Sequence, residues 1–299
     1  MRIAFVGLPL AALLLAGDGH TITWAGICRK GALGTRRLTR ILGKDRVRIV
    51  PDLAKSVDAI AAAKPDLLVS WFWTKKVPAS VRRLARHGAI GVHPSLLPRH
   101  RGPDPTFWAI ASGDAETGVT AHVLEDDYDT GAMLGKRVLR IDPEWNAWTL
   151  AKRLDRPSLA LLRDVVKAYS RGEPPAHEVQ DHSRATPAPA PTDEELELRW
   201  SDSAEAVVRR IRAAAPWPGA FTAIRFSGSI GEEVLTITRA KVTSNVPKAL
   251  APGEAFVRKD GIAVVRAADA GVELHGARLD DDEDETDLDA EAIAELLAP

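Results

Sequence analysis

The sequence predicts an α/β domain with a mostly parallel sheet, followed by a small β-barrel domain. In the first half of the chain, short apolar runs alternate with helical stretches, which is typical of strand–helix–strand crossovers. A segment rich in Thr-Pro and Ala-Pro steps comes next, and short apolar runs separated by turn residues follow it. The 299 residues are enough for two domains of ordinary size.

Five strands are expected in the first 93 residues, at 2–6, 21–27, 47–50, 66–71 and 89–93. Helices are expected between them, over 10–16, 57–63 and 79–86. The apolar run at 3–16 also resembles the core of a secretion signal. No small-residue cleavage motif follows it, and the next strand continues the same pattern. We therefore expect this run to form the first strand and helix of the sheet, and the protein to be cytoplasmic.

Two further strands, at 117–124 and 133–139, flank the polar loop EDDYDTG. A long helix is expected from about Trp148 to Ser170. Pro157 should break or kink this helix, because proline has no backbone N–H to donate.

The Pro/Ala-rich stretch favours extended backbone geometry and separates the two expected domains. We expect a first domain over 1–182, a semi-rigid linker over 183–198 and a second domain over 199–299. The second domain should open with a helix and continue as short strands. These elements are expected at 203–214, 220–226, 234–237 and 261–265.

Composition excludes several classes of protein. The chain has 40 Lys and Arg against 41 Asp and Glu, which argues against a protein built chiefly to hold nucleic acid phosphates. The single cysteine, Cys28, cannot form an internal disulfide, and no Cys/His cluster predicts a metal site. No apolar run approaches the about 18 residues that a membrane helix needs. The first strand is followed by Gly7-Leu8-Pro9-Leu10 rather than GxGxxG, which argues against a nicotinamide dinucleotide.

Two residues are candidates for acid–base chemistry. His93 ends a predicted strand and opens a stiff loop bounded by prolines, at the sheet edge where ligands bind in such folds. A histidine there is by itself more often structural. Asp129, however, also lies just beyond a strand, and a carboxylate beside an imidazole would orient the ring and raise its pKa. Such a pair suits general acid–base catalysis on an amine nucleophile.

Four segments of the chain resemble the folate-dependent formyltransferases. HPSLLPRHRG at 93–102 and DYDTG at 127–131 resemble motifs of the catalytic domain. ELRWSDSAE at 197–205 and IRAAAPWPGAFT at 211–222 resemble the opening of the C-terminal domain in the two-domain, methionyl-tRNA formyltransferase-like type. The resemblance covers nearly the whole chain. It implies a Rossmann-like domain joined to an OB-like barrel, with 10-formyltetrahydrofolate as the formyl donor and no metal.

The same resemblance implies where the folate would bind. In the family, the pterin enters a pocket beside the SLLP loop and the backbone of the acidic loop. Carried over by position, the folate-binding residues are Trp73, Lys75, Val77, Ser95, Leu97, Asp127 and Tyr128. The alternative is that the aromatic residues of 71–73 belong to the core, although the two lysines that follow favour the rim of a pocket.

One position departs from the family pattern. The family's catalytic residues are Asn-x-His and Asp, but the asparagine position here is Gly91. That amide donates to the formyl oxygen as negative charge develops, and losing one such donor typically costs about a hundred- to a thousand-fold in rate. Three alternatives follow. Another group replaces the amide, with His122 the first candidate and Ser95 the second. Transfer is slow, or the protein transfers a different one-carbon unit or hydrolyses the donor. Or folate is bound without turnover.

The acceptor is the least determined part of the prediction. Methionyl-tRNA formyltransferases carry a long basic insertion after the second strand, whereas the basic segment here, 29–40, is short. The six consecutive acidic residues at 280–285 would repel phosphate. Both segments could equally be solvated surface. We expect a small-molecule amine acceptor, such as an amino acid, hydroxyornithine, an amino sugar or a peptide. Met-tRNA is the main alternative.

Overall fold

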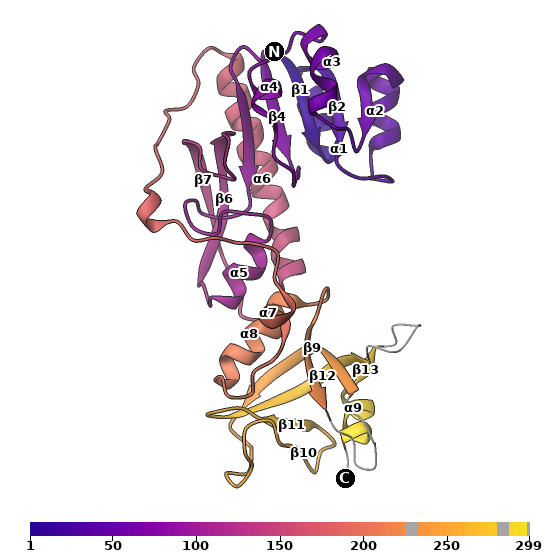
Figure 1. Ribbon diagram of the computed structural model, residues 1–299, viewed down its shortest axis with the longest axis vertical. Helices are drawn as coiled ribbons and strands as arrows, with labels where there is room; N and C mark the ends of the chain where they lie inside the picture. The colour runs from indigo at the N-terminus through magenta and orange to yellow at the C-terminus, as the bar shows by residue number, and fades with distance from the viewer. Residues whose placement is uncertain (225–232, 280–286, 298–299) are drawn as a thin grey trace. The chain divides into compact units, whose positions relative to one another are not determined.

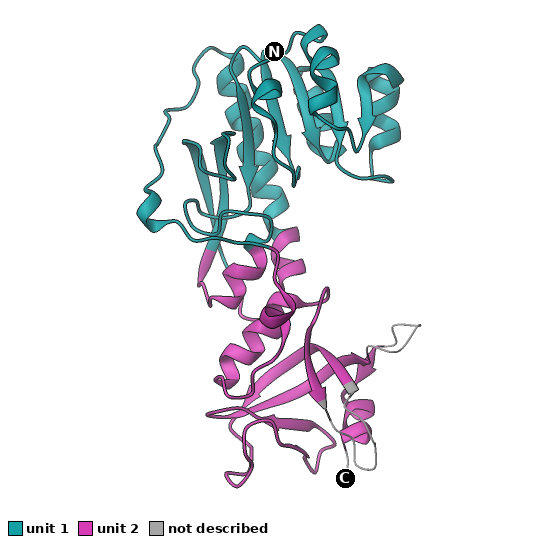
Figure 2. Ribbon diagram, viewed as in Figure 1, with its two compact units in different colours: residues 1–105, 117–140, 153–189 teal, residues 106–116, 141–152, 190–299 magenta. Residues whose placement is uncertain are grey.

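The computed structural model describes residues 1–224, 233–279 and 287–297, which form two compact units (Figure 2). Unit 1 comprises 1–105, 117–140 and 153–189, and unit 2 comprises 106–116, 141–152 and 190–299. The expected domain boundaries, after residues 182 and 198, stay a prediction. The end of the strand expected at 220–226 and the acidic run 280–285 lie outside the described residues. No helix in the described part of the chain is long and apolar enough to cross a membrane.

Unit 1 is built on one seven-stranded sheet, with strand order β3-β2-β1-β4-β5-β6-β7 (Figure 1). Its strands are β1 (Arg2–Gly7), β2 (Thr21–Ile27), β3 (Val47–Ile49), β4 (Leu67–Trp71), β5 (Ala89–His93), β6 (Glu116–Val123) and β7 (Met133–Arg140). The first five strands in this order pair in parallel, and β6 pairs antiparallel with β5. The strand order reverses between β1 and β4, as in Rossmann-like sheets. The predicted α/β fold is confirmed.

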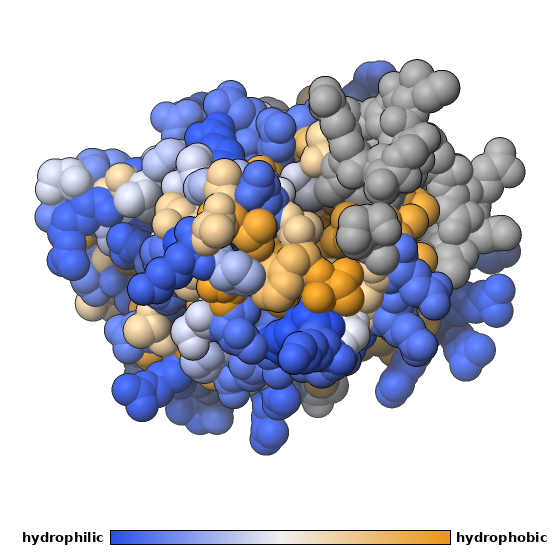
Figure 3. Space-filling model, turned by 90° about the horizontal axis from the view of Figure 1, so that it is seen from below, coloured by the Kyte–Doolittle hydropathy of each residue, from blue (hydrophilic) through white to orange (hydrophobic). Residues whose placement is uncertain are grey.

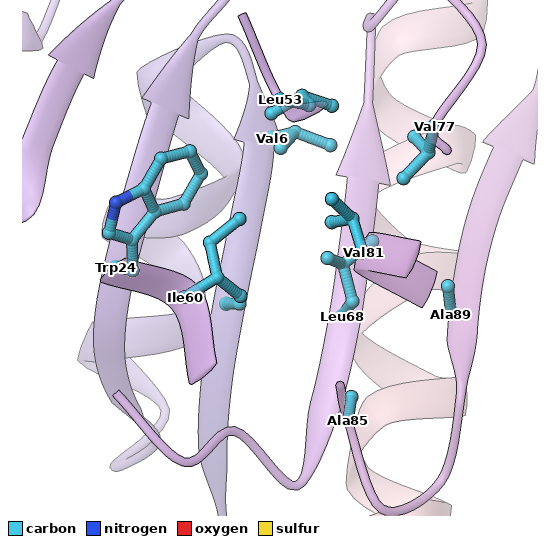
Figure 4. Packing of buried hydrophobic residues seen from close by; sticks show 10 residues of the cluster. Val6, Trp24, Leu53, Ile60, Leu68, Val77, Val81, Ala85 and Ala89 are labelled. Carbon is cyan, nitrogen blue, oxygen red and sulfur yellow. The ribbon is translucent and has the colours of Figure 1, made fainter. Parts of the chain in front are cut away.

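Alternating apolar residues cover the two faces of this sheet. On one face, Ala4, Val6 and Leu68 of the strands pack against Ile60 of α3 (Val57–Ala62) and Val81 of α4 (Ala79–Arg82) (Figure 4). Helix α4 ends earlier than the expected 79–86. The amides after it, at residues 86 and 87, donate instead to the carbonyls of residues 65 and 66.

Two helices are linked by a charged pair elsewhere in unit 1. The guanidinium of Arg163 in α6 (Ala147–Ser170) donates to both carboxylate oxygens of Asp18, which follows α1 (Pro9–Gly17), at 2.6 and 2.5 Å. Helix α6 runs through Pro157 without a break, so of the two expected effects the break is wrong and the kink stays a prediction. The other helical segments of this unit are α2 (Thr35–Leu42) and the short 3₁₀ turns η1 (Lys44–Arg46), η2 (Ala54–Ser56) and η3 (His182–Arg184).

Unit 2 is built on an antiparallel sheet. Its strands are β8 (Ala220–Ile224), β9 (Glu233–Thr243), β10 (Ala255–Val257), β11 (Ala263–Arg266), β12 (Gly271–Leu279) and β13 (Leu288–Asp289). They are ordered β10-β11-β12-β9-β8, with β13 also on β12. Helices of this part of the chain are α5 (Pro105–Ala111), α7 (Asp193–Leu196), α8 (Ala204–Ala214) and α9 (Ala290–Leu297). The antiparallel sheet is consistent with the expected small barrel.

Local sequence signals fix the start of α8. The hydroxyl of Ser203 accepts a hydrogen bond from the amide of Ala206 at 3.3 Å, which satisfies one of the free donors at the helix start.

On the face of the molecule seen in Figure 3, hydrophobic residues gather near the centre and hydrophilic residues border them.

Candidate active site

A cavity of about 140 Å³ lies in unit 1 at the carboxyl ends of β4 and β5. Because these strands are parallel neighbours, both end at the same edge of the sheet. The lining of the cavity includes residues from four places: the strands, the segment after β4, the loop after β6 and helix α6. Among them are Ser70, Phe72, Trp73, Gly91, His93, His122, Tyr128, Asp129, Asp155 and Ser158.

Two histidines share one carboxylate in this cavity. Asp129 Oδ2 lies 3.4 Å from His93 Nδ1, and Asp129 Oδ1 lies 3.3 Å from His122 Nε2. Gly91 faces His122 in register across the β5–β6 pair, and His93 lies two residues further along β5. Side chains two apart on a strand share a face, so strand register brings the two rings to one side of the sheet. The amide of Gly102 donates to Asp129 Oδ2 at 3.0 Å.

In each histidine ring, the nitrogen that does not face Asp129 lies within hydrogen-bonding distance of a backbone carbonyl oxygen. His93 Nε2 lies 2.7 Å from the oxygen of His100, and His122 Nδ1 lies 2.9 Å from the oxygen of Val123. A carbonyl can only accept, so these nitrogens carry hydrogens and donate. The nitrogen that remains on each ring faces Asp129. The three side chains therefore form one array, His93–Asp129–His122, between two carbonyl oxygens.

The Pro/Ala-rich segment holds the His100 carbonyl in place. The amide of His100 donates to Thr186 Oγ1 at 2.9 Å, and the backbone around Arg101 pairs with residues 186–188. The buried Gln180 side chain donates to the carbonyls of Asp129 and Gly131, at 2.7 Å each. The sequence showed no sign of these supports, because pairing between distant segments leaves no local pattern.

Left-handed backbone conformations gather at this site. Among the described non-glycine residues, five have a positive φ, and three of these belong to the site. Phe72 (φ 58°) and Asp129 (φ 57°) line the cavity, and His100 (φ 56°) presents its carbonyl to His93. This conformation costs a non-glycine residue free energy, and such strain is concentrated where function requires a particular geometry.

The charge states of the array differ from residue to residue. Burial disfavours the charged form of Asp129, but His93, His122 and the Gly102 amide outweigh that effect and lower its pKa to about 2. Burial lowers the pKa of His93, against the raising effects of Asp129 and the His100 carbonyl. Our expectation of a raised His93 pKa is therefore wrong. Asp129 acts in the expected direction, but the loss of solvation is larger.

The surroundings of Gly91 show which atoms a side chain at the family's asparagine position would contact. A Cβ atom there would lie 3.7 Å from His122 Nε2 and 3.0 Å from the Leu124 Cδ2 methyl. A side chain at this position would therefore press on Leu124 first and contact the His122 ring beside it. This arrangement favours His122 as the substitute donor, a role that stays a prediction.

The seven expected folate-binding residues are divided between the cavity and its surroundings. Trp73 and Tyr128 line it, and the Lys76 ammonium lies 5.2 Å from the centre of the Tyr128 ring. The other five do not line it. Lys75 and Asp127 are exposed, Val77 and Leu97 are buried in the core, and the buried Ser95 donates to the carbonyl of Arg99 at 2.7 Å. The binding roles of all seven stay predictions.

Sequence reasoning missed Ser70, Asp155 and Ser158, which also line the cavity. Ser158 did carry a usable signal, because it falls four residues after Leu154 on the apolar stripe of α6. Its hydroxyl accepts the indole N–H of Trp71 at 2.8 Å.

The fold and site together define a Rossmann-like α/β protein with an acid–base array at the carboxyl edge of its sheet. Residues 50–166 match the family model described as formyl transferase, and residues 191–286 match that of the formyl transferase C-terminal domain. The chain belongs to the formyl transferase family, as the sequence motifs suggested.

Similar proteins include two methionyl-tRNA formyltransferases. The one from Citrifermentans bemidjiense is 33% identical over 71% of this chain and 64% of its own length. The one from Legionella pneumophila (strain Paris) is 36% identical over 70% of this chain and 65% of its own length. The matched region thus spans slightly less than two thirds of these relatives.

Two solved structures share the fold. HypX from Aquifex aeolicus in complex with tetrahydrofolic acid has a TM-score of 0.67 at 19% identity, covering 98% of this chain and 46% of that chain. The N-formyltransferase from Helicobacter canadensis in complex with folinic acid and dTDP-3-aminofucose has a TM-score of 0.67 at 12% identity. The latter match covers 92% of this chain and 98% of that chain.

Proposed function

We propose that the protein transfers a formyl group from 10-formyltetrahydrofolate to the amine of a small molecule. The observation that carries this proposal is the His93–Asp129–His122 array in a cavity of a formyl transferase fold. Relatives named as formyltransferases, and fold neighbours that bind tetrahydrofolic acid or folinic acid, support the choice of donor. Trp73 and Tyr128 offer aromatic surface for its pterin ring.

His93 is the proton carrier in this mechanism. Its lowered pKa keeps the ring neutral, and the His100 carbonyl fixes the hydrogen on Nε2, so Nδ1 is the basic atom. The acceptor amine attacks the formyl carbon, Nδ1 takes the amine proton, and the same proton then passes to nitrogen-10 of the donor as the carbon–nitrogen bond breaks. Asp129, which stays ionised, stabilises the imidazolium between these two steps.

His122 stabilises the oxyanion in place of the missing asparagine. Its Nε2 atom lies 3.3 Å from Asp129 Oδ1. In this role Nδ1 of His122 donates to the Val123 carbonyl, and Nε2 presents a second N–H. This second N–H lies beside the Gly91 position, where the negative charge of the tetrahedral intermediate would develop.

The lining of the cavity favours a small acceptor without phosphate. None of the described residues that line it is a lysine or arginine, so an acceptor phosphate would meet no cationic partner there. Met-tRNA is the second candidate, since the relatives are named for it. Its supporting observation is a row of exposed cations on and before α2, formed by Arg29, Lys30, Arg36, Arg37 and Arg40.

Three variants test the assignment in an assay of tetrahydrofolate release and of formylated product. Gly91→Asn should reduce transfer, because the amide would compete with the His122 ring for space. His122→Ala should also reduce transfer, and Gly91→Asn in the His122→Ala background should recover part of the loss. A large gain in transfer from Gly91→Asn alone would instead indicate a decayed transferase. Donor loss without any formylated product would indicate hydrolysis, and folate binding without donor loss would indicate a binding protein.

A further inference from the structure

Asp155 is a carboxylate of the cavity that the transfer mechanism does not use. It lies on α6, half-buried, and lines the cavity. Among the residues that the structure describes, it makes no ion pair and no side-chain hydrogen bond. The two histidines and the other carboxylate of the cavity, His93, His122 and Asp129, are paired with one another. Asp155 is therefore the cavity carboxylate still free to bind a ligand.

The position of Asp155 is well defined. Ser158, one helical turn further on, accepts the indole N–H of the buried Trp71 and so fixes this face of α6 against the end of β4. Residues three apart on a helix lie on the same face, so Asp155 and Ser158 line the cavity together. The carboxylate is thus presented from a rigid element rather than from a loop.

An unpaired, partly buried carboxylate is costly unless a cation joins it. Burial raises the pKa of Asp155, which is the effect of lost solvation without a compensating partner. No lysine or arginine of the described lining residues supplies the missing charge. A cation would therefore have to come from the molecule that enters the cavity.

We propose that Asp155 determines acceptor specificity by binding a cationic group of the acceptor, separate from the amine that receives the formyl group. The preferred acceptors are then small molecules with two amino groups, one protonated against Asp155 and one unprotonated for attack. This inference rests on the proposed function. It narrows the acceptor class from amines in general to diamines and basic amino acids.

The test compares two molecules of equal length, of which only one is cationic. The protein saturated with tetrahydrofolate, and the protein alone, are titrated calorimetrically with 1,5-diaminopentane and with 1,5-pentanediol, its uncharged counterpart. We expect the diamine to bind about tenfold more tightly, as for one charge-assisted hydrogen bond. Asp155→Asn should bring the ratio of the two dissociation constants to about one, because the charge-assisted hydrogen bond is lost. The control is Asp164→Asn, the same change at an exposed position of α6 that pairs with Arg137, and it should keep the preference.

The outcomes separate this inference from the proposed function. Equal binding of the diamine and the diol by the unmodified protein, or a preference for the diamine that survives Asp155→Asn, would overturn the role of Asp155. A parallel titration with 5-formyltetrahydrofolate tests the folate site, and its failure would count against the proposed function. The amine titration without folate would still decide the role of Asp155.

Discussion

The Nε2 atom of His122 lies 3.7 Å from the point that a Cβ atom on Gly91 would occupy, and the two residues face one another across β5 and β6. A side chain on residue 91 would contact the His122 ring and press on Leu124, so the glycine leaves the Nε2 side of His122 uncovered at this position. In a family whose pattern places an asparagine at this position, the pair is a coherent rearrangement of the site. It is the structural reason to expect turnover despite the missing amide.

Replacing His93 by alanine should abolish formyl transfer while leaving folate affinity within a few-fold. The ring carries the proton, whereas Trp73 and Tyr128 supply the aromatic surface for the pterin ring. General acid–base catalysis is worth about a hundred- to ten-thousand-fold in rate, so the loss should reach at least that range. Single-turnover transfer and a folate titration measure the two effects. The exposed His177 provides a control, and near-normal turnover by His93→Ala would remove the acid–base assignment.

The pH dependence of transfer should have an acid limb below pH 6.5. The neutral form of His93 is the active one, and its pKa is lowered by burial, so activity falls only as pH drops through that lowered value. Asp129, with a pKa of about 2, stays ionised throughout the working range and adds no limb of its own. Asp129→Asn removes a charge that raises the His93 pKa, so the residual activity should show its limb at still lower pH. A limb that moves upward would contradict this account of the array.

Thr186→Val should slow transfer several-fold through His100. The change removes the hydroxyl that accepts the His100 amide and loosens the carbonyl that holds His93. The stability cost of one such hydrogen bond is about 1 kcal/mol. Because the carbonyl raises the His93 pKa, the acid limb of the rate profile should also move downward. Thr35→Val, which removes a 2.6 Å hydroxyl hydrogen bond to Ala32, is the control, and it should leave the profile unmoved.

Ser158→Ala should lower the free energy of unfolding by about 1–3 kcal/mol, the cost of leaving a buried donor without a partner. The donor is the indole N–H of Trp71, whose side chain is buried at the end of β4. Chemical denaturation with tryptophan fluorescence measures the change. Ser170→Ala, at the exposed end of the same helix, should have little effect. Equal costs for the two variants would show that Trp71 finds another partner.

The salt dependence of tRNA binding separates the two acceptor classes. A protein that neutralises several phosphates loses affinity steeply as salt rises, with a slope set by the number of contacts. For a small-molecule enzyme we expect weak tRNA binding, unchanged when Arg36 and Arg37 of α2 are replaced by glutamine. Tight binding with a steep slope that these replacements flatten would favour Met-tRNA instead.

Much of the fold could be predicted because burial is periodic in the local sequence. The strands ending at Trp71 and His93 are continuous apolar runs, and the loop containing Asp129 follows another. Because β6 runs antiparallel to β5, the strand order does not by itself bring Asp129 to His93, and their meeting depends on the loop that follows β6. The motifs of the resemblance added the candidate role of His122 and the importance of Gly91.

The rest of the site depends on interactions that local sequence does not encode. Thr186 lies in a Pro/Ala-rich stretch that composition describes only as extended, yet it supports His100 from 86 residues away. Asp155 lies on a helix where a carboxylate is expected to face solvent, and only the tertiary structure places it in the cavity. The pKa of His93 is lowered by burial, and this effect is larger than the raising effect of Asp129, which the sequence motifs indicate.

The most direct test of the central claim is a calorimetric titration of the protein with 5-formyltetrahydrofolate, a stable analogue of the donor, because it requires no knowledge of the acceptor. The account predicts binding in the micromolar range, weakened when Trp73 is replaced by alanine. No detectable binding would mean that the cavity around Gly91 and His122 serves another ligand, and that the chain shares only its fold with the formyltransferases.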